Sequence, residues 1–354
     1  MSLTFLMLCA LVLSASGTFL VFRLAPGLGL VSRVVGRSSH SVPTPNGGGV
    51  GIVIVGTVFG GWLAWGKSGH IWAIIGFAAP LAVIGLLDDI RHRPARLRLL
   101  VQVAVVAGWL VFLGDLARIV WGPSSWITLH GVSSLTAAAL FALLLLAGVW
   151  WINLFNFMDG IDGIAGLQAM YMLLAGAGLA LQSNALLVGH PVWMLTVCIA
   201  SGTAGFLLFN WPPARIFMGD VGSTWLAFTL FALATLSVAQ GWVNLAVWIV
   251  LAAVFVTDAT VTLLVRMARG DRWYEAHNCH VYQRLARQWS SDRTSGHRAV
   301  SLLVVAIDLI WLTPLAWACL AWPQWSWLCV LAAYFPLVVG ALALGAGRPV
   351  GQGQ

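Results

Sequence analysis

The sequence predicts an all-α, polytopic integral membrane protein with about eleven transmembrane helices, its N-terminus outside and its C-terminus cytoplasmic. The 354 residues are 60% hydrophobic and only 8% charged, with a mean hydropathy of +0.92, whereas soluble chains carry about 25% charged residues. The apolar residues form unbroken runs close to the ~20 residues that a spanning helix needs. Lys and Arg are concentrated in every second connection between these runs. This composition excludes a soluble nucleic-acid binder, a disulfide scaffold and a disordered tail.

The apolar runs show none of the alternation that a membrane barrel strand requires. They cover approximately residues 3–22, 48–66, 71–87, 97–114, 133–152, 164–182, 191–209, 221–239, 242–265, 299–321 and 325–346. The first run resembles a signal peptide at Ser14–Gly17, where small residues suggest a cleavage site. However, no basic residue precedes it and Arg23 follows it, which favours an uncleaved helix with its N-terminus outside.

The positive charges orient the predicted helices. Sixteen of the eighteen Lys and Arg residues lie in the connections after odd-numbered runs: Arg23, Arg33, Arg37, Arg91, Arg93, Arg96, Arg98, Arg215, Arg266, Arg269, Arg272, Arg284, Arg287, Arg293, Arg298 and Arg348. Only Lys67 and Arg118 lie in the others. The positive-inside rule makes the odd face cytoplasmic. We therefore expect a single transmembrane catalytic domain, 1–354, with an active site formed by cytoplasmic loops 23–47, 88–97, 153–163, 210–220 and 266–298.

An aspartate pair, Asp88 and Asp89, stands at the cytoplasmic mouth of the third run. Adjacent carboxylates repel each other and lose hydration there, so a cation must compensate them. One interpretation is a charge cluster at a helix end, balanced by the arginines of residues 91–98. The other is a carboxylate pair that holds a divalent metal or acts as a base beside an anionic substrate.

Asn153, Asn156, Asp159 and Asp162 recur every three residues between two runs. In a helix they would form one slowly drifting polar strip, and the glycines of 160–166 would allow local unwinding. Four oxygen-bearing side chains in register suit a hard cation or a polar ligand. The alternative is a simple helix cap, which needs only one such residue.

The segment 209–225 contains a third acidic position. Pro212 and Pro213 are expected to end the preceding helix. Asp220, flanked by Gly219 and Gly222, would present its carboxylate on a tight turn or would cap the next helix. Arg215 is the nearest cation in the sequence.

Two further segments have the residue types of anion sites. Gly47–Gly49 predict a backbone nest, with His40 among the nearby donors, although a flexible entry into the next helix fits as well. In loop 266–298, His277 and His280 are expected on one helical face among several arginines. Cys279 alone does not complete a zinc site, so the loop predicts a phosphate-binding surface or a set of solvated charges.

The segments PTPNGGG, LLDDIRHRP, NLFNFMDGIDG, PPARIFMGDVGS and HNCHVYQRL, in this order along the chain, together resemble the motif set of the polyprenyl-phosphate N-acetylhexosamine-1-phosphate transferases. This family of membrane enzymes includes the phospho-MurNAc-pentapeptide translocase. The resemblance spans about residues 37–290. Within the family, the run Tyr282-Gln283-Arg284-Leu285, which follows the segment His277–His280 (here called the His box), is most similar to the O-antigen-initiating subgroup.

The resemblance implies transfer of an N-acetylated (6-deoxy)hexosamine-1-phosphate from a UDP-sugar to undecaprenyl phosphate. The products would be undecaprenyl-pyrophosphoryl-sugar and UMP, in the initiating step of O-antigen or related cell-surface polysaccharide synthesis. The implied cofactor is Mg²⁺, with Mn²⁺ as an alternative. The implied location is the bacterial inner membrane, with the active site on its cytoplasmic face. The partners would be the acceptor lipid, a UDP-N-acetylhexosamine-type donor and membrane lipids, without nucleic acid; a homodimer is compatible with the sequence, which does not fix the stoichiometry.

The family motifs also imply catalytic roles for individual residues. Asp220 and Asn156 would hold the Mg²⁺ that bridges the donor pyrophosphate, and Asp159 would lie beside it. Asp88 would be the base that deprotonates or orients the lipid phosphate, with Asp89 supporting it. Phosphoryl transfer depends mainly on positioning and charge neutralisation, which scattered carboxylates and arginines can supply.

The implied donor contacts come from other motifs. Asp162 and Phe217 would read and stack the uracil, and the histidines His277 and His280 would lie near the donor phosphates. Asp258 would orient this His box. The remaining substrate-binding positions expected are Asn153, Arg215, Gly219, Arg284 and His40.

The chain departs from the family pattern at three places. Asn46 stands where many relatives have a basic residue, His92 where a further Asp often follows the aspartate pair, and the His box reads His-Asn-Cys-His. Two other functions are compatible with the residues alone. A secondary transporter of an anionic substrate would use the carboxylates as proton or cation sites, and an Asp-rich membrane prenyltransferase would release pyrophosphate. The sequence also leaves open whether the lipid phosphate attacks directly or a phosphoryl-aspartate forms.

Overall fold

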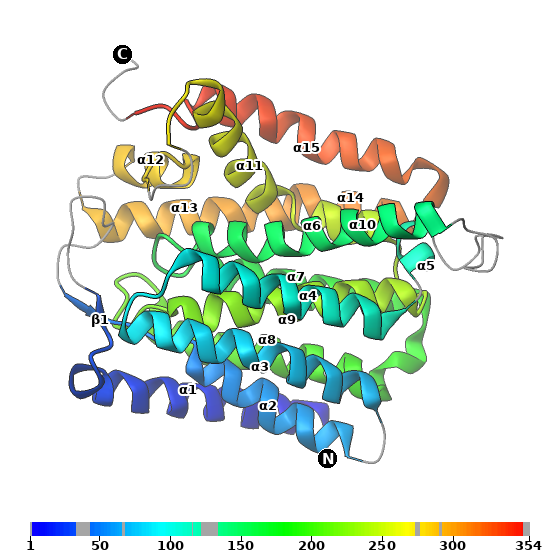
Figure 1. Ribbon diagram of the computed structural model, residues 1–354, viewed down its shortest axis with the longest axis horizontal. Helices are drawn as coiled ribbons and strands as arrows, with labels where there is room; N and C mark the ends of the chain where they lie inside the picture. The colour runs from blue at the N-terminus through cyan, green and yellow to red at the C-terminus, as the bar shows by residue number, and fades with distance from the viewer. Residues whose placement is uncertain are drawn as a thin grey trace.

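The computed structural model describes residues 2–32, 43–65, 68–114, 116–121, 134–272, 277–289 and 292–349. His40, one of the predicted substrate-binding residues, lies outside these ranges. The described chain is almost entirely helical, and most of the helices run side by side between two ends of the molecule (Figure 1). One short hairpin pairs β1 with β2, antiparallel, at one of these ends.

The elements follow the apolar runs closely. Their bounds are α1 Leu3–Leu28, β1 Val31–Ser32, β2 Thr44–Pro45, α2 Val50–Ala64, α3 Gly69–Ile90, α4 Ala95–Leu113, α5 Leu116–Trp121, α6 Ser134–Met158, α7 Ile164–Ser183, η2 Ala185–Gly189, α8 Pro191–Asn210, α9 Gly219–Ala239, α10 Leu245–Leu251, α11 Ala253–Ala268, α12 Val281–Gln288, α13 Arg293–Ile307, η3 Asp308–Leu312, α14 Thr313–Ala321, η4 Pro323–Trp325 and α15 Ser326–Ala343.

The structure confirms a multi-pass, all-α membrane protein. Among the described residues, nine helices are long and apolar enough to cross a membrane, and α10 with α11 forms a further pair, bent by 68°. Helix α2 is apolar but shorter, at 15 residues. Each predicted run therefore coincides with a helix, while the number of spans and the orientation of the termini stay predictions.

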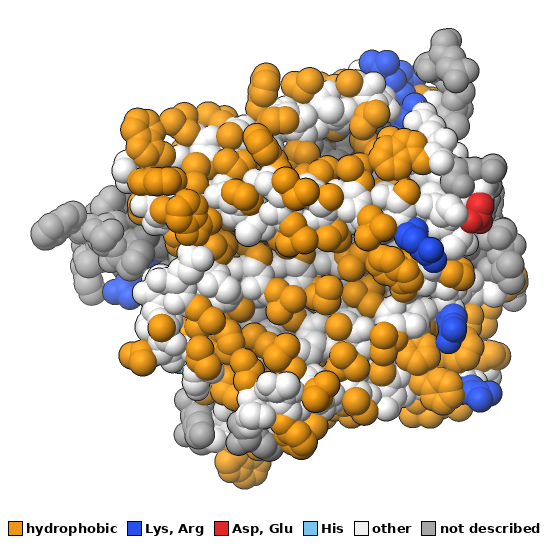
Figure 2. Space-filling view, turned by 180° about the vertical axis from the view of Figure 1, so that it is seen from behind, with side chains coloured by type: hydrophobic (Ala, Val, Ile, Leu, Met, Phe, Trp, Pro, Cys, Tyr) orange, Lys and Arg blue, Asp and Glu red, His pale blue; other side chains and the backbone are white. Residues whose placement is uncertain are grey.

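Helices α7, α8 and α9 form the interior of the bundle. The most apolar window of α9 is 89% buried, compared with 17% for the window in the peripheral Pro323–Ala343. The outer flanks carry hydrophobic side chains, and most Lys and Arg side chains visible in Figure 2 lie toward one end. Because α9 is enclosed by its neighbours, a side chain at its N-terminus is held from several sides.

The prediction that Asn153, Asn156, Asp159 and Asp162 form one polar strip on a helix is wrong for the last two residues. Helix α6 ends at Met158 and α7 begins at Ile164, so Asp159 and Asp162 lie in the intervening loop. Gly163 adopts a φ of 80°, which an L-residue with a side chain rarely adopts. The glycines thus end the helix and turn both carboxylates out of its register.

The predicted anion nest at Gly47–Gly49 is also wrong. The N–H groups of Gly48 and Gly49 already donate to the carbonyls of Phe217 and Met218, at 2.8 and 2.9 Å. A Cβ on Gly49 would lie 2.3 Å from the Cα of Gly222. These glycines therefore serve close packing between the start of α2 and the start of α9.

Candidate active site

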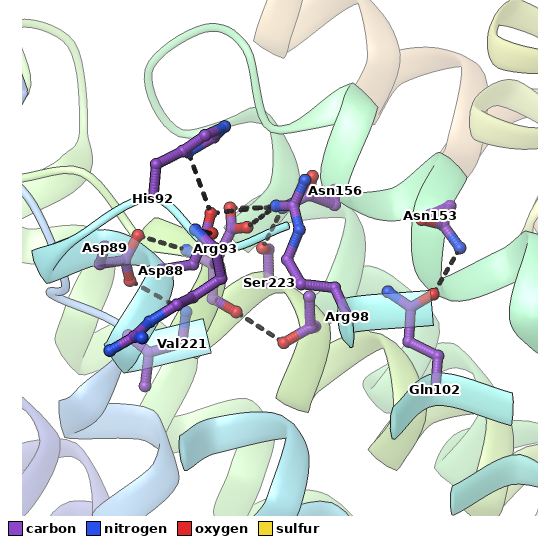
Figure 3. Close-up of polar contacts among 12 residues, drawn as sticks. Asp88, Asp89, His92, Arg93, Arg98, Gln102, Asn153, Asn156, Val221 and Ser223 are labelled. Carbon is purple, nitrogen blue, oxygen red and sulfur yellow. Dashed lines mark hydrogen bonds and ion pairs between the residues drawn. The ribbon is translucent and has the colours of Figure 1, made fainter. Parts of the chain in front are cut away.

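Four segments far apart in the sequence meet at one end of the bundle. They are the end of α3, the start of α4, the end of α6 and the start of α9, which bring together Asp88, Arg98, Asn156 and Asp220 (Figure 3). We call these four residues the carboxylate–arginine cluster. Since each lies at a helix end, the bundle itself fixes their positions.

A single guanidinium nitrogen joins the two carboxylates of this cluster. Nη1 of Arg98 lies 3.0 Å from Oδ2 of Asp88 and 2.7 Å from Oδ2 of Asp220. The Asp88 side chain is only 7% exposed and that of Asp220 22%, so water screens their mutual repulsion poorly. The positive charge of Arg98, placed between the two carboxylates, offsets this repulsion.

Asp220 lies in the first turn of α9, where the helix dipole favours a negative charge. Its Oδ1 accepts a hydrogen bond from the amide of Asn156, at 2.9 Å. The same amide nitrogen donates to Oγ of Ser223, at 2.8 Å. Asp220 was expected on the turn before this helix; it is instead part of the helix and faces α6.

Asp89 positions the start of α9. Its carboxylate accepts the N–H groups of Asp220 and Val221, at 2.9 and 3.0 Å, and the side-chain amide of Asn46, at 2.9 Å. An oxygen acceptor that satisfies the free N–H groups of a helix N-terminus stabilises that terminus. Asp89 thus fixes the backbone that carries Asp220, and Asn46, which replaces a basic residue of the family pattern, holds Asp89.

The loop between α6 and α7 contributes two more carboxylates. Burial, with further effects of Asp220 and Asp162, raises the pKa of Asp159 from 3.8 to about 7. Asp162 accepts the N–H of Ala214 at 3.0 Å and lies 3.4 Å from Nδ1 of His297. Asp162 therefore joins this loop to the α8–α9 connection.

Asn153 lies two turns deeper along α6 than the loop. Its amide donates to Gln102 of α4 at 2.7 Å (Figure 3). It also donates to the carbonyl of Val149, at 2.8 Å. It thereby links α6 to α4 behind the carboxylate–arginine cluster and does not face the Asp159–Asp162 loop.

The His box does not form the helical face that its spacing predicted. His277 and His280 precede α12, and their rings stack with centroids 4.9 Å apart and an interplanar angle of 29°. The hydroxyl of Tyr282 donates to the carbonyl of Phe157 at 2.9 Å. A Cβ on Gly160 would lie 2.0 Å from that hydroxyl, so the box packs directly against the end of α6.

Asp258 of α11 holds the His box in place through hydrogen bonds. Its oxygens accept the N–H groups of Val281 and Tyr282, at 3.0 and 2.9 Å, and Oδ1 lies 3.2 Å from Nδ1 of His280. The carboxylate caps α12 in place of a local side chain, because His280 makes no capping bond. This geometry supports the orienting role that the family resemblance implied.

We predict that Asp258→Asn lowers turnover at least about tenfold and also lowers the melting temperature. The amide would turn its NH₂ group toward one of the two buried N–H donors. That donor would then lack an acceptor, which costs about 1–3 kcal/mol. Thr262→Val is the matched control, because Thr262 makes only one bond to Asp258, at 3.2 Å. Turnover and thermal unfolding in detergent measure both effects. Equal losses in the two variants would contradict the assignment.

The His box also predicts a pH effect on stability. Burial, together with His280 and Arg266, lowers the pKa of His277 from 6.5 to about 4. The unfolded chain takes up a proton here below about pH 6.5 and the folded chain only near pH 4, so stability is lost as the pH falls through this window. We expect a smaller drop in melting temperature between pH 7 and 5 for His277→Gln than for the wild type. His92→Gln, at a side chain that is 87% exposed, should match the wild type; if His277→Gln does so too, the assignment is wrong.

Four residues that were predicted to bind substrate either do not contact the carboxylate–arginine cluster or take part in packing and backbone hydrogen bonds. Arg284 does not reach the cluster: its guanidinium donates to the carbonyls of Leu344 and Arg348, at 3.1 and 3.0 Å. Gly219 has a φ of 76° and packs against Asp89. The backbone carbonyl of Phe217 accepts the N–H of Gly48, and the N–H of Phe217 donates to the carbonyl of Pro45. Arg215 is exposed on the α8–α9 connection.

Other contributors were not predicted as site residues. Arg98 was noted only as one of four arginines that could balance the aspartate pair, yet it is the one that reaches Asp220. Ser223 and Tyr282 lie inside the motif segments but were given no role there, and His297 lies outside all of these segments. Ser223 lies one turn after Asp220, which is the spacing that could have indicated a shared face.

The donor set fits a hard divalent cation. Five carboxylates surround this end of α9, those of Asp88, Asp89, Asp159, Asp162 and Asp220. Arg98 contacts two of them, Asp88 and Asp220. In the described part of the chain, no three His, Cys, Asp or Glu side chains enclose a metal position. Mg²⁺ takes few protein ligands and keeps water and phosphate oxygens, so Asp220 with the Asn156 amide suits it.

A cavity of about 40 Å³ lies beside the cluster, lined by Arg98, Asn153, Asn156 and Asp220 among others. This volume holds an ion or one to three water molecules, on the scale of 10–15 Å³ per water. It is too small for a nucleotide, so a nucleotide substrate would bind outside it, toward the loop and the His box.

Comparison with known proteins identifies the family. Residues 71–238 match glycosyl transferase family 4. A Bacillus subtilis (strain 168) protein named probable undecaprenyl-phosphate N-acetylglucosaminyl 1-phosphate transferase is 27% identical over 78% of this chain and 75% of its own length. The decaprenyl-phosphate N-acetylglucosaminephosphotransferase of Mycobacterium tuberculosis is 28% identical over 84% and 78%.

A phospho-N-acetylmuramoyl-pentapeptide-transferase of Synechococcus is more similar over a shorter region. It is 34% identical over 63% of this chain and 67% of its own length. The matched regions of all three relatives are long enough to include most of the transmembrane bundle. The chain therefore belongs to glycosyl transferase family 4, the membrane-embedded polyprenyl-phosphate sugar-1-phosphate transferases.

Proposed function

We propose that this protein transfers an N-acetylhexosamine-1-phosphate from a UDP-sugar to undecaprenyl phosphate, at the cytoplasmic face of the bacterial inner membrane. The observation that carries the proposal is the carboxylate–arginine cluster. It gathers two carboxylates, an amide and a guanidinium from four helices at one end of the bundle. Such a set can hold two phosphate-bearing substrates close together, which their mutual repulsion would otherwise prevent.

Asp220 and Asn156 are the residues proposed to hold Mg²⁺. When bound, the ion would neutralise charge on the donor pyrophosphate. A cation is needed here because the surrounding carboxylates would otherwise repel that pyrophosphate. Asp89, through the start of α9, keeps Asp220 in place.

Asp88 is proposed to act on the acceptor. Its Oδ1 accepts the backbone N–H of Arg93, and its Oδ2 accepts from Arg98. From this position Oδ2 would accept or orient the proton of the lipid phosphate, whose oxygen then attacks the β-phosphorus of the donor. The bond from that phosphorus to the bridging oxygen breaks, and UMP leaves. Arg98 stays between Asp88 and Asp220 to stabilise the charge that spreads over the transferred phosphoryl group.

The His box and the Asp159–Asp162 loop are proposed to bind the donor nucleotide. They lie side by side, because Tyr282 bonds to Phe157 and packs on Gly160. We propose an N-acetylhexosamine donor, since two of the relatives are named for N-acetylglucosamine. Initiation of O-antigen with a 6-deoxy sugar is the finer proposal, and a donor panel decides between these sugars.

The test is release of UMP by the purified protein in detergent, with undecaprenyl phosphate, Mg²⁺ and a panel of UDP-sugars. We expect UMP from at least one UDP-N-acetylhexosamine. No UMP from any donor would contradict the proposal. Release without the acceptor lipid would favour a phosphoryl-aspartate route over direct attack.

The same assay separates the two alternative functions. A prenyltransferase would release pyrophosphate from a prenyl diphosphate, and a transporter would accumulate an anion in proteoliposomes without UMP. The arrangement favours a transferase, because the paired carboxylates lie at helix ends, where an acceptor headgroup can reach them.

A further inference from the structure

A second cavity lies at the opposite end of the bundle from the carboxylate–arginine cluster. Its volume is about 350 Å³, and its polar lining comes from Ser68, His70, His190 and Gln240, beside Trp242. Ser68 and His70 stand at the start of α3 and Gln240 at the end of α9. Both helices reach the active site with their other ends, so we call this cavity the distal histidine pocket.

The hydrogen bonding of His190 determines what this pocket can bind. Nδ1 of His190 accepts the backbone N–H of Val192, at 3.3 Å, and so caps α8. The neutral ring therefore carries its proton on Nε2. A metal at Nε2 would require the proton on Nδ1, where the capping bond already lies. His190 thus offers a donor to the pocket and is a poor metal ligand.

Ring packing holds the two imidazoles in place. Trp242 packs edge-on against His190, with ring centroids 4.9 Å apart, and Phe112 packs against His70 at 5.9 Å. Burial, and secondly the proximity of His70, lower the pKa of His190. The ring therefore remains a neutral N–H donor near pH 7.

The remaining polar side chains can donate hydrogen bonds too, and the Ser68 hydroxyl and the Gln240 amide can each also accept them. The Ser68 hydroxyl makes no capping bond to α3, and the Gln240 amide is exposed to the pocket. The backbone carbonyl of Leu236, on the same wall, is already paired with the N–H of Gln240 at 2.9 Å. A ligand that brings hydrogen-bond acceptors can therefore be bound by all four polar side chains of the pocket.

The charge of the lining residues further restricts which ligands the pocket can bind. None of the described residues that line it is Asp, Glu, Lys or Arg. Neutral donors can stabilise one negative charge but offset a dianion poorly, because the ion loses more hydration than such donors replace. The pocket also lies at the ends of helices of about 20 residues, which is the depth of the headgroups in a bilayer. A volume of 350 Å³ admits more than a bare phosphate ion.

We propose that the distal histidine pocket binds a phosphodiester monoanion, with His70, His190, Ser68 and Gln240 as its donors. The group can come from an anionic phospholipid or from a soluble glycerophosphodiester, and the chemistry of recognition is the same. The site is separate from the proposed transfer chemistry and does not depend on it.

The experiment is native mass spectrometry of the full chain in detergent, titrated with phosphatidylglycerol and, separately, with glycerophosphoglycerol. The test variant is His70→Ala/His190→Asn. Asparagine can still accept the Val192 N–H as a helix cap, but it lacks the ring N–H. Gln182→Ala, an exposed polar residue at the end of α7 outside the pocket, is the matched control. Melting temperature and UMP release report whether each variant is folded.

We expect one phosphatidylglycerol per wild-type chain, and an apparent Kd at least tenfold higher in the double variant and unchanged in Gln182→Ala. If only glycerophosphoglycerol shows this dependence, the source is soluble and the site is upheld. Equal binding by the wild type and the double variant, or no binding of either compound, would overturn the proposal. If the double variant fails to fold, Ser68→Ala/Gln240→Ala removes two donors without touching the cap, and unchanged affinity there would also overturn it.

Discussion

Replacing Arg98 with glutamine is expected to lower UMP release by about two to three orders of magnitude. The change leaves Asp88 and Asp220 facing each other without the guanidinium nitrogen that lies 3.0 and 2.7 Å from them. Loss of one preorganised stabilising group costs a factor of about 10²–10³ in turnover. The two side chains would then repel each other without a positive charge between them, and the geometry of the site would change.

Arg98→Lys separates charge from geometry in the same assay. Lysine keeps the charge but not the planar fork, so we expect it to restore only part of the activity. Arg96→Gln is the matched control, because Arg96 is exposed on the first turn of the same helix. Wild-type turnover in Arg98→Gln would show that the contact between the two carboxylates does not matter for catalysis.

Asp220→Asn is expected to have the second large effect. We predict a loss of about a hundredfold or more in UMP release, and a shift of the half-saturating Mg²⁺ concentration to at least tenfold higher values. The substitution removes the negative charge proposed to hold the ion, while Asn156 can still bond to the new side chain. The backbone bonds from the start of α9 to Asp89 are also kept.

The measurement is a Mg²⁺ titration of initial rates for the wild type and Asp220→Asn. Asp271→Asn serves as the control, because Asp271 pairs with Arg269 in the loop after α11 and contacts no residue of the cluster. If Asp220→Asn reduces the rate without changing the Mg²⁺ dependence, Asp220 acts on the substrate directly and the proposed metal assignment is wrong.

Hydropathy alone predicted the bundle well, for a physical reason. A chain in hydrocarbon must satisfy its backbone hydrogen bonds internally, so each long apolar run becomes a helix. The broken helix α10–α11 was predicted as one continuous run, 242–265, because its composition stays apolar through the bend at Ala252. Here the side chains carry no signal of the backbone's change of direction.

The site was predictable as a set of residues but not as a set of contacts. Asp88, Asn156 and Asp220 could be identified because ionised and amide groups are costly at a span's edge. The bond between Arg98 and Asp220 crosses 122 positions of sequence, and no local pattern distinguishes Arg98 from its neighbours. The helical spacings assumed for the Asp159–Asp162 loop and for the His box were wrong because glycine in one case, and Asp258 from another helix in the other, set the backbone there.

The roles proposed for Asp88, Arg98 and Asp220 all require that the bond broken in the donor is the one between its two phosphates. The direct measurement is a ³¹P NMR spectrum of the products formed from a UDP-N-acetylhexosamine that turns over, undecaprenyl phosphate and Mg²⁺. Transfer of sugar-1-phosphate predicts UMP together with a new pair of coupled pyrophosphate signals on the lipid. If the spectrum instead showed UDP and a phosphodiester that links the sugar to the lipid, the donor bond broken would be the one between the sugar carbon and its phosphate oxygen. That result would contradict the proposed roles of Asp88, Arg98 and Asp220.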